Sequence, residues 1–389
     1  MRRQAIVAMA LAIGGLSLAV APTPSPPLPT SGSKLQQRSE LIQRDRRVRP
    51  APSASRQVFE LTAQIPSPTL PPRENARVVQ VTSGRQIAFG LYNPGIPDDM
   101  GKVSATEDLV GKHAAILMWY KHWGGAWNNF YAQWVNAVSA HGSVPMITWM
   151  SDDYAIPGYP NPAVESTYSN LRILSGAFDD FIRGWADGLK ATGRLVLLRF
   201  DHEMNGNWYA WAPGFNGNTA ANYIAMWRHV HDIFVREGAT NVRWVWSPNV
   251  DYPGAIAFEA MYPGDAYVDW VALDGYNWGM TNGYTPWRSF SQVFGSSYSR
   301  LNRLTQKPLM IAEVGSVEAG APAGQSKASW IASMLMQELP GLFPRVRAFV
   351  WFDQNNGAGQ DFRIASSSAS ASAFARSLQR PSYLSTFEN

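Results

Sequence analysis

The most informative part of the chain is residues 195–209, where an apolar run ends in a cluster of polar and aromatic side chains. The run is Leu195-Val196-Leu197-Leu198-Arg199-Phe200, and it continues as Asp201-His202-Glu203-Met204-Asn205-Gly206-Asn207-Trp208-Tyr209. A continuous apolar run of this length suits a strand that is buried on both faces of a parallel sheet. The carboxylic acid of Glu203 therefore follows the carboxyl end of a buried strand.

Seven further apolar runs alternate with longer helical patterns. They occupy residues 87–91, 115–119, 144–149, 242–246, 270–273, 309–312 and 346–351. The helical segments include one that stops at Thr192-Gly193 and one that Thr219 can cap, which runs to Glu237 and ends at Gly238. Eight strands joined by crossovers over about 300 residues predict an α/β fold, a (β/α)8 TIM barrel, with a doubly wound open sheet as the alternative. A glycine-rich phosphate-binding motif does not follow the first run, which disfavours dinucleotide binding.

The N-terminal residues differ in composition from the rest of the chain. Arg2-Arg3 and the apolar stretch after them predict a signal peptide or N-terminal anchor over residues 1–21. Residues 22–78 are rich in Pro, Ser, Arg and Gln, and we expect a disordered linker there. Residues 79–389 then form the barrel. We expect a protein that is secreted or bound to the cell envelope, with membrane contact only through an uncleaved N-terminal segment.

Charge and cysteine content exclude several classes of function. The formal net charge is +4, but residues 1–77 hold eleven Lys or Arg and only four Asp or Glu. Residues 78–389 hold 22 Lys or Arg and 25 Asp or Glu, which gives this part a net charge of −3. A nucleic-acid partner is therefore not expected for the folded domain. The chain has no cysteine, which excludes disulfides, thiolate metal sites and cysteine nucleophiles. The spacing of His and acidic residues matches neither zinc nor calcium motifs, so we predict no metal site. We also expect a monomer.

A second carboxylic acid, Glu313, follows the apolar run that ends at residue 312. The fourth and seventh strands of a TIM barrel lie across its mouth from one another, so Glu203 and Glu313 can face each other. Two carboxylic acids in this arrangement are what cleavage of a glycosidic bond requires. Glu203 would act as the acid, kept protonated by the charge of Glu313 and an aromatic wall from Trp208, and Glu313 would be the nucleophile. The alternative is structural, in which either acid caps a helix or pairs with Arg199.

At these residues the chain resembles a known family. Residues 199–209 resemble the acid/base segment of glycoside hydrolase family 26, the β-mannanase family, and Ile311-Ala312-Glu313-Val314-Gly315 resembles its nucleophile segment. The resemblance covers roughly residues 85–380. It implies a retaining (β/α)8 hydrolase without a cofactor, in which Glu203 is the acid/base and Glu313 is the nucleophile.

The resemblance also implies four substrate-binding residues. His202 would contact the sugar hydroxyl next to the broken bond, and Trp208 would line the leaving-group side. Tyr276 would hold the nucleophile carboxylate, and Trp351 would form a platform under the sugar at the cleavage point. The competing interpretations are pairing of His202 with Asp201, and simple packing of Tyr276 and Trp351 at the barrel mouth.

Other side chains near the strand ends are candidates for binding more distal sugars by stacking or by hydrogen bonds. They are Trp119, His122, Trp123, Trp149 and Asp353. Each of them could equally be structural. His229 and His231 lie in a predicted amphipathic helix, and we interpret them as surface or packing residues.

The leading hypothesis is an endo-acting β-mannanase that cuts β-1,4-mannosidic bonds in mannan, glucomannan or galactomannan. The first alternative is a mixed-linkage β-1,3-1,4-glucanase, because the resembled family contains that specificity as well. The second is a non-catalytic carbohydrate-binding barrel at the cell envelope, which the presence of both Glu203 and Glu313 disfavours.

Overall fold

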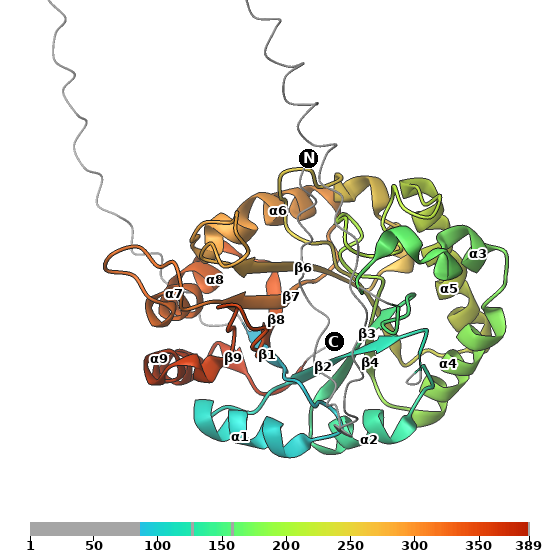
Figure 1. Cartoon of the computed structure of the whole chain (residues 1–389). Coiled ribbons are helices and arrows are strands. Elements are labelled where there is room, and N and C mark those ends of the chain that lie inside the picture. The colour runs from blue at the N-terminus through green and yellow to red at the C-terminus, as the bar shows by residue number, and fades with distance from the viewer. Residues whose placement is uncertain (1–85, 126–127, 157–158, 388–389) are drawn as a thin grey trace, which may run out of the picture. The chain divides into compact units, whose positions relative to one another are not determined.

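The computed structural model describes residues 86–125, 128–156 and 159–387 (Figure 1). The signal peptide and linker that the sequence predicts for residues 1–78 lie outside the described residues. Among the helices that the structure describes, none combines the length and the apolar character needed to cross a membrane.

Eight parallel strands form a closed barrel. They are β1 (Ile87–Tyr92), β2 (Ile116–His122), β3 (Val144–Met150), β4 (Val196–Phe200), β5 (Val242–Trp246), β6 (Trp270–Asn277), β7 (Leu309–Ser316) and β8 (Val346–Phe352). Each strand pairs with the next, and β1 pairs with both β8 and β2, which closes the sheet on itself. The short strand β9 (Tyr383–Leu384) pairs with the start of β1. The predicted TIM barrel is confirmed, and closure rules out the doubly wound open sheet.

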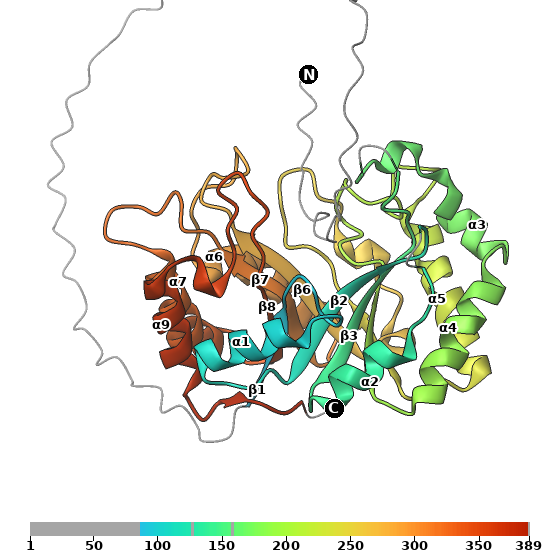
Figure 2. The ribbon, with the colours of Figure 1, turned by 60° about the horizontal axis from the view of Figure 1, so that its bottom comes forward.

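The described helices form a ring outside the strands (Figure 1). They are α1 (Met100–Val110), α2 (Ala132–Ala140), α3 (Asn170–Leu174), α4 (Asp179–Thr192), α5 (Ala220–Glu237), α6 (Phe290–Leu304), α7 (Lys327–Ser333), α8 (Leu339–Leu342) and α9 (Ser368–Leu378). A π-helical segment, Met334–Glu338, joins α7 to α8, and two 3-10 turns at Phe258–Met261 and Asp265–Tyr267 connect β5 to β6. In Figure 2 the longer loops rise from one end of the barrel.

The predicted ends of α5 are confirmed by their capping bonds. The Thr219 hydroxyl accepts a hydrogen bond from the backbone N–H of Asn222, and the Asn222 side chain accepts one from the backbone N–H of Thr219. This capping box satisfies two N–H groups that the first helical turn leaves unpaired. Gly238 ends the helix with φ at 72°, a left-handed conformation that glycine adopts without strain.

Alternating residues of each strand bury two different faces. One cluster fills the barrel interior and includes Met118, Leu197 and Val350. The other lies between the strands and the helices and includes Trp149 and Phe200. Because both faces are buried, the strands read as continuous apolar runs, and that is why the eight runs were recognisable in the sequence. The same property conceals which residues face inward.

Strands β6 and β7 are longer than their apolar runs. The runs end at residues 273 and 312, whereas the strands continue to Asn277 and Ser316. Glu313 therefore lies within β7, and not just past it as the sequence predicts, and Tyr276 lies within β6. Glu203 does follow β4, as predicted.

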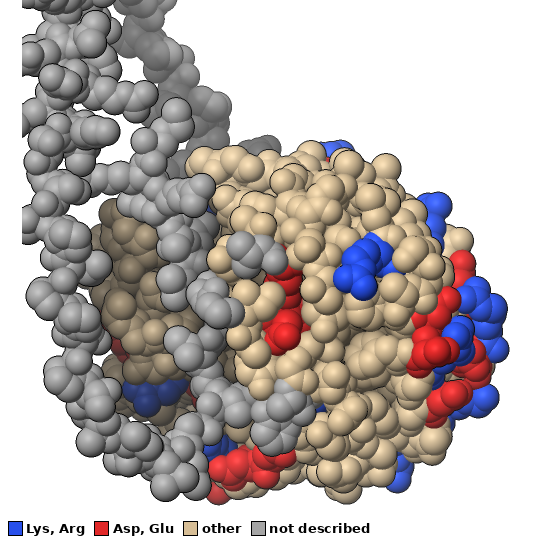
Figure 3. Space-filling view, turned by 45° about the vertical axis from the view of Figure 1, so that its right-hand side comes forward, with Lys and Arg blue, Asp and Glu red and all other residues tan. Residues whose placement is uncertain are grey.

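Charged side chains of both signs are present on the face drawn in Figure 3, where they are interspersed toward the right-hand edge. This distribution agrees with the near-neutral charge of residues 78–389.

Candidate active site

A turn in the left-handed region of backbone conformation positions Glu203. Asp201 has φ at 39° and Glu203 has φ at 51°, values that cost a non-glycine residue on the order of 1–3 kcal/mol each. Hydrogen bonds hold the turn: Ser151 donates to the Asp201 carboxylate from its backbone N–H (2.8 Å) and its hydroxyl (2.7 Å). The backbone N–H of Glu203 donates to the carbonyl oxygen of Ser247 at 2.7 Å. These bonds fix the position of the Glu203 side chain at the end of β4.

A β-bulge in β7 turns Glu313 toward the barrel interior. In the pairing with β6, Leu273 is opposite Ile311 and Asp274 is opposite Glu313, so β7 has one extra residue, Ala312. The pairing with β8 shifts over the same segment. A shift of one residue moves every later side chain to the other face of a strand, and bulges are often found next to active sites. The bulge therefore directs Glu313 inward from a strand whose simple alternation would direct it outward.

Three donors converge on the fully buried Glu313 carboxylate. Tyr120 donates to Oε1 at 2.6 Å, the Arg199 guanidinium donates to Oε1 as well, and Tyr276 donates to Oε2. Arg199 also donates to Asp274 Oδ2 at 2.9 Å, so one buried cation lies between two carboxylates. An ionised carboxylate only accepts hydrogen bonds, so this arrangement satisfies Glu313 as an anion with a fixed orientation.

Glu203, in contrast to Glu313, is protonated at neutral pH. Its pKa is raised to about 8, first by burial and then by the negative charge of Glu313. Trp208, whose indole N–H donates to Glu203 Oε2 at 2.7 Å, and the charge of Arg199 oppose this effect. A neutral carboxylic acid beside an anionic one is the pairing that general acid catalysis requires.

His202 is fully buried beside these carboxylates. Its ring lies against Tyr209, with the ring centroids 4.8 Å apart, and neither ring nitrogen has a hydrogen-bond partner among the described residues. Burial, followed by the positive charges of Arg199 and His122, lowers the pKa of His202 well below its usual value. The sequence-based alternative, pairing with Asp201, is not what the structure has, because Ser151 holds the Asp201 carboxylate. The ring is therefore neutral and has nitrogens available for a ligand or water.

A pocket opens in front of Glu203. Its lining includes Trp208, Tyr252, Tyr276 and Trp278 together with Glu203. The remaining lining residues are Asn249, Val250, Asp251, Asn282, Tyr284, Thr285 and Arg288. Aromatic faces with a few convergent polar groups are typical of sites that bind sugars and other ligands with both polar and apolar surfaces.

The structure contradicts the substrate-platform role of Trp351. Its side chain is fully buried between β8 and the helices, 4.9 Å from the ring of Phe374 in α9, and its indole N–H donates to the carbonyl oxygen of Phe362 at 2.9 Å. Alternation along β8 directs Trp351 outward and Phe352 into the barrel interior. A side chain in this position cannot contact a ligand at the barrel mouth.

The same correction applies to the three tryptophans proposed for distal sugars. Trp119, Trp123 and Trp149 are between 0 and 3% exposed and belong to the layer between strands and helices. Trp123 stacks on Phe200 with the ring centroids 5.8 Å apart. In β2 it is Tyr120, the neighbour of Trp119, that reaches the site.

His122 lies near the site but is engaged by another acid. Its Nδ1 is 2.6 Å from Asp152 Oδ1, and Tyr159 donates to the other oxygen of Asp152 at 2.6 Å. The His122 side chain is 15% exposed. Asp353 accepts hydrogen bonds from the Asn93 side chain and the backbone N–H of Ile364, which is a structural role.

Sequence reasoning named Arg199 only as a possible partner of either acid, which its contact with Glu313 bears out, and it missed Asp274, Tyr120 and Tyr252. Arg199 lies within an apolar run and Asp274 directly follows one, and this was an available signal, because a buried charge requires a partner. Tyr120 and Tyr252 had no comparable signal. The position of Tyr120 depends on which residues of β2 face the barrel interior, and the position of Tyr252 depends on the loop after β5.

Comparisons with known proteins find relatives of this chain. The model of glycosyl hydrolase family 26 matches residues 161–317, which contain both Glu203 and Glu313. Endoglucanase H of Acetivibrio thermocellus is 36% identical over 302 residues, which are 74% of this chain and 31% of that protein. A mannan endo-1,4-beta-mannosidase of Caldalkalibacillus mannanilyticus is 33% identical over 207 residues, 50% of this chain and 36% of that protein. The chain thus spans about a third of the length of these curated relatives.

Solved structures share the fold. The catalytic domain of a family 26 endo-beta-1,4-mannanase from Bacillus sp. JAMB-750 superposes with a TM-score of 0.56 at 20% identity, covering 78% of this chain and 88% of that one. A family 26 beta-mannanase from Bacteroides ovatus gives a TM-score of 0.57 at 19% identity, covering 77% of this chain and 90% of that one. The barrel and its sequence relatives define the class as glycoside hydrolases. Within that class, the chain belongs to glycoside hydrolase family 26.

Proposed function

We propose that this protein is an endo-acting, retaining β-glycoside hydrolase that cleaves β-1,4-mannosidic bonds in mannan-type polysaccharides. The observation that carries the hydrolytic mechanism is the pair of buried carboxyl groups in opposite states: Glu203 with a pKa raised to about 8, and Glu313 held as an anion by Tyr120, Arg199 and Tyr276. The choice of mannan rests on the likeness to the mannan endo-1,4-beta-mannosidase. Cleavage with retention needs one protonated carboxyl group and one nucleophilic carboxylate.

The first step forms a glycosyl-enzyme. Glu313 attacks the anomeric carbon while Glu203 transfers its proton to the leaving glycosidic oxygen, so that the C–O bond breaks as a new ester bond forms. The donors to Glu313 orient the attacking oxygen, and Trp208 orients the Glu203 carboxyl group. Neutral His202 has free nitrogens for a hydroxyl of the bound sugar.

The second step releases the sugar. Once Glu313 is an ester it carries no charge, so one of the two causes of the raised pKa of Glu203 disappears. Glu203, now ionised, takes a proton from water, and the water oxygen attacks the anomeric carbon and displaces Glu313. The enzyme returns to its starting protonation states.

A mixed-linkage β-1,3-1,4-glucan is the second candidate substrate. The observation in its favour is the likeness to Endoglucanase H, which extends over 302 residues, compared with 207 for the mannosidase. Mannose and glucose differ in the orientation of one hydroxyl group, so a few contacts in the pocket decide between them.

The test measures release of reducing sugar from mannan, glucomannan and barley β-glucan by the full chain and by two variants. We expect hydrolysis of the mannans, and a loss of several orders of magnitude in Glu203→Ala and Glu313→Ala. On substrates with a good leaving group, azide should restore turnover to Glu203→Ala alone. Glu237→Gln, at the far end of α5, is the matched control. Activity on barley glucan alone would favour the second candidate, and an unaffected Glu313→Ala variant would refute the mechanism.

A further inference from the structure

A second group of convergent side chains lies apart from the pocket. Glu107 is in α1, His113 is in the segment between α1 and β2, and His141 directly follows α2. His113 precedes the start of β2, whereas Glu203 follows the end of β4. Because the strands of a barrel are parallel, the two groups are near opposite ends of the barrel. This cluster therefore has no part in the proposed hydrolysis.

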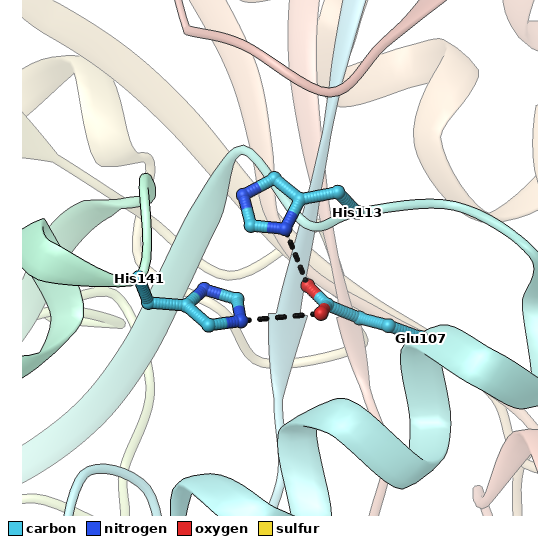
Figure 4. Close-up of side chains that lie close together, drawn as sticks. All are labelled: Glu107, His113 and His141. Atoms are coloured by element: carbon cyan, nitrogen blue, oxygen red, sulfur yellow. Dashed lines mark hydrogen bonds and ion pairs between the residues drawn. The ribbon is translucent and has the colours of Figure 1, made fainter.

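The two histidine rings present nitrogens to one carboxylate. His113 Nδ1 is 3.1 Å from Glu107 Oε1, and His141 Nε2 is 3.1 Å from Glu107 Oε2. The rings are stacked with their centroids 4.5 Å apart, and Figure 4 shows both directed at Glu107. One ligand atom from each residue lies within 4.8 Å of the other two.

The hydrogen bonds around His141 require a cation at its Nε2. The Ser143 hydroxyl donates to the carbonyl oxygen of Ala114 at 2.6 Å, so at its 2.9 Å contact with His141 Nδ1 the hydroxyl oxygen must accept. Nδ1 therefore carries the hydrogen. In the neutral ring, Nε2 then directs a lone pair at the Glu107 carboxylate, which also offers only lone pairs. A proton or a metal ion must lie between these two atoms.

The second histidine gives a metal ion two nitrogen ligands beside the carboxylate. A proton between His141 and Glu107 would satisfy that one contact, while neutral His113 donates its Nδ1–H to the same carboxylate. One divalent ion would instead accept lone pairs from two neutral rings and from the carboxylate. Tetrahedral zinc bonds of about 2.0–2.1 Å place ligand atoms about 3.3 Å apart. One ligand atom from each of the three residues lies within 4.8 Å of the other two, so small side-chain shifts would bring them to that spacing.

The surroundings of the cluster also resemble those of a metal site. Ligand histidines usually donate their second N–H to a fixed acceptor, as His141 does to Ser143, and ligand carboxylates are usually hydrogen-bonded, as Glu107 is by the backbone N–H of Ala114 at 2.8 Å. The side chains of Glu107 and His141 are 14% and 18% exposed, and that of His113 is 33% exposed. Water can therefore reach a fourth coordination position.

We propose that Glu107, His113 and His141 form a binding site for one divalent transition-metal ion, with Zn²⁺ as the preferred ion. Two imidazole nitrogens and one carboxylate oxygen suit zinc, whereas Ca²⁺ and Mg²⁺ prefer six or more oxygen ligands. A bound ion would connect α1 with the end of α2 and stabilise the folded barrel, because an ion that binds only the folded state raises its stability. Sequence spacing could not indicate this site, since 34 residues separate Glu107 from His141.

The test is zinc binding by the full, tag-free chain after treatment with EDTA. We expect calorimetry to show one Zn²⁺ per chain, a rise in the melting temperature of several degrees with ZnCl₂, and no rise with MgCl₂. The chain has no cysteine and six histidines, so few other sites can compete. With Co²⁺ in place of zinc, we expect the visible absorption bands of a tetrahedral site.

Variants locate the ion. His113→Gln and His141→Gln should each weaken Zn²⁺ affinity at least tenfold and abolish the rise in melting temperature. His229→Gln should bind zinc normally, because His229 contacts one carboxylate, Asp179, at 2.7 Å without a second histidine. Circular dichroism checks that each variant is folded, and Glu107→Gln provides a third variant. Absence of zinc binding in the parent chain, or unchanged binding in both His113→Gln and His141→Gln, would overturn the proposal.

Discussion

Tyr276 in β6 donates its hydroxyl hydrogen to Oε2 of Glu313 in the neighbouring strand β7. The contact depends on the bulge at Ala312, because the bulge brings Asp274 opposite Glu313 and directs Glu313 into the barrel interior. A single extra residue in β7 thus decides whether the Glu313 carboxylate faces the barrel interior. Tyr276 lines the pocket in front of Glu203, so it connects the buried carboxylate with the space where substrate would bind.

Tyr276→Phe should lower kcat/KM about 10- to 100-fold, because a hydrogen bond to a charged group contributes about 1.5–3 kcal/mol and each 1.4 kcal/mol changes a rate tenfold. Tyr383→Phe is the control, since it removes a buried tyrosine hydrogen bond (2.6 Å, to the carbonyl oxygen of Leu335) at a distance from the pocket. Steady-state kinetics on soluble polymer measures both. Equal kinetics for the parent and Tyr276→Phe would show that the hydrogen bond does not position the nucleophile.

The pH profile of kcat/KM should have an alkaline limb near pH 8, because Glu203 must be protonated in the free enzyme and its pKa is raised to about 8. Trp208→Phe removes a donor that lowers this pKa, so the limb should move to higher pH. Trp227→Phe, which loses an indole hydrogen bond to the carbonyl oxygen of Tyr267, should leave the limb in place. A limb that moves to lower pH in Trp208→Phe would contradict the assignment of Glu203 as the acid.

Glu203→Gln should be more stable than the parent chain at alkaline pH. Below pH 4.5 the Glu203 carboxyl group is protonated in both the folded and the unfolded state and contributes no pH dependence. Between pH 4.5 and about 8 the unfolded state releases its proton while the folded state retains it, so the parent loses stability, on the order of a few kcal/mol in total. Glutamine stays neutral and avoids this loss. Urea unfolding at pH 5 and pH 8 measures the difference between the two chains, and a difference that stays constant with pH would contradict the raised pKa.

A chain that begins at Val79 should fold and hydrolyse soluble polysaccharide as the full chain does. The reason is compositional, since residues 22–78 hold too little apolar surface to offset the entropy of ordering them. Thermal unfolding and reducing-sugar assays compare the two chains. A shortened chain that is insoluble or inactive would show that residues before Val79 complete the barrel.

The sequence predicted the fold better than the directions of individual side chains. Eight apolar runs identified eight strands, and the residues around Glu203 and Glu313 identified the family, because local composition carries both signals. Trp351 was misassigned for a physical reason. A strand buried on both faces shows no alternation in its sequence, so Trp351 and its inward-facing neighbour Phe352 look equivalent.

Other features depend on tertiary structure and leave little trace in the sequence. The bulge at Ala312 follows from the pairing of β7 with both of its neighbours, and the cluster of Glu107, His113 and His141 follows from the packing of α1 beside the end of α2. Arg199 was the exception. A charged residue in a buried run indicates a buried partner, and Asp274 and Glu313 are those partners.

The central claim is that Glu313 attacks the sugar directly, and the configuration of the first product tests it. Proton NMR of the reducing ends, recorded before mutarotation, reports that configuration without reference to any related protein. Direct attack by Glu313 followed by attack of water inverts the anomeric carbon twice, so we predict that the first products have the β configuration. First products in the α configuration would mean that water attacks in a single step, and Glu313 would then be a base and not the nucleophile.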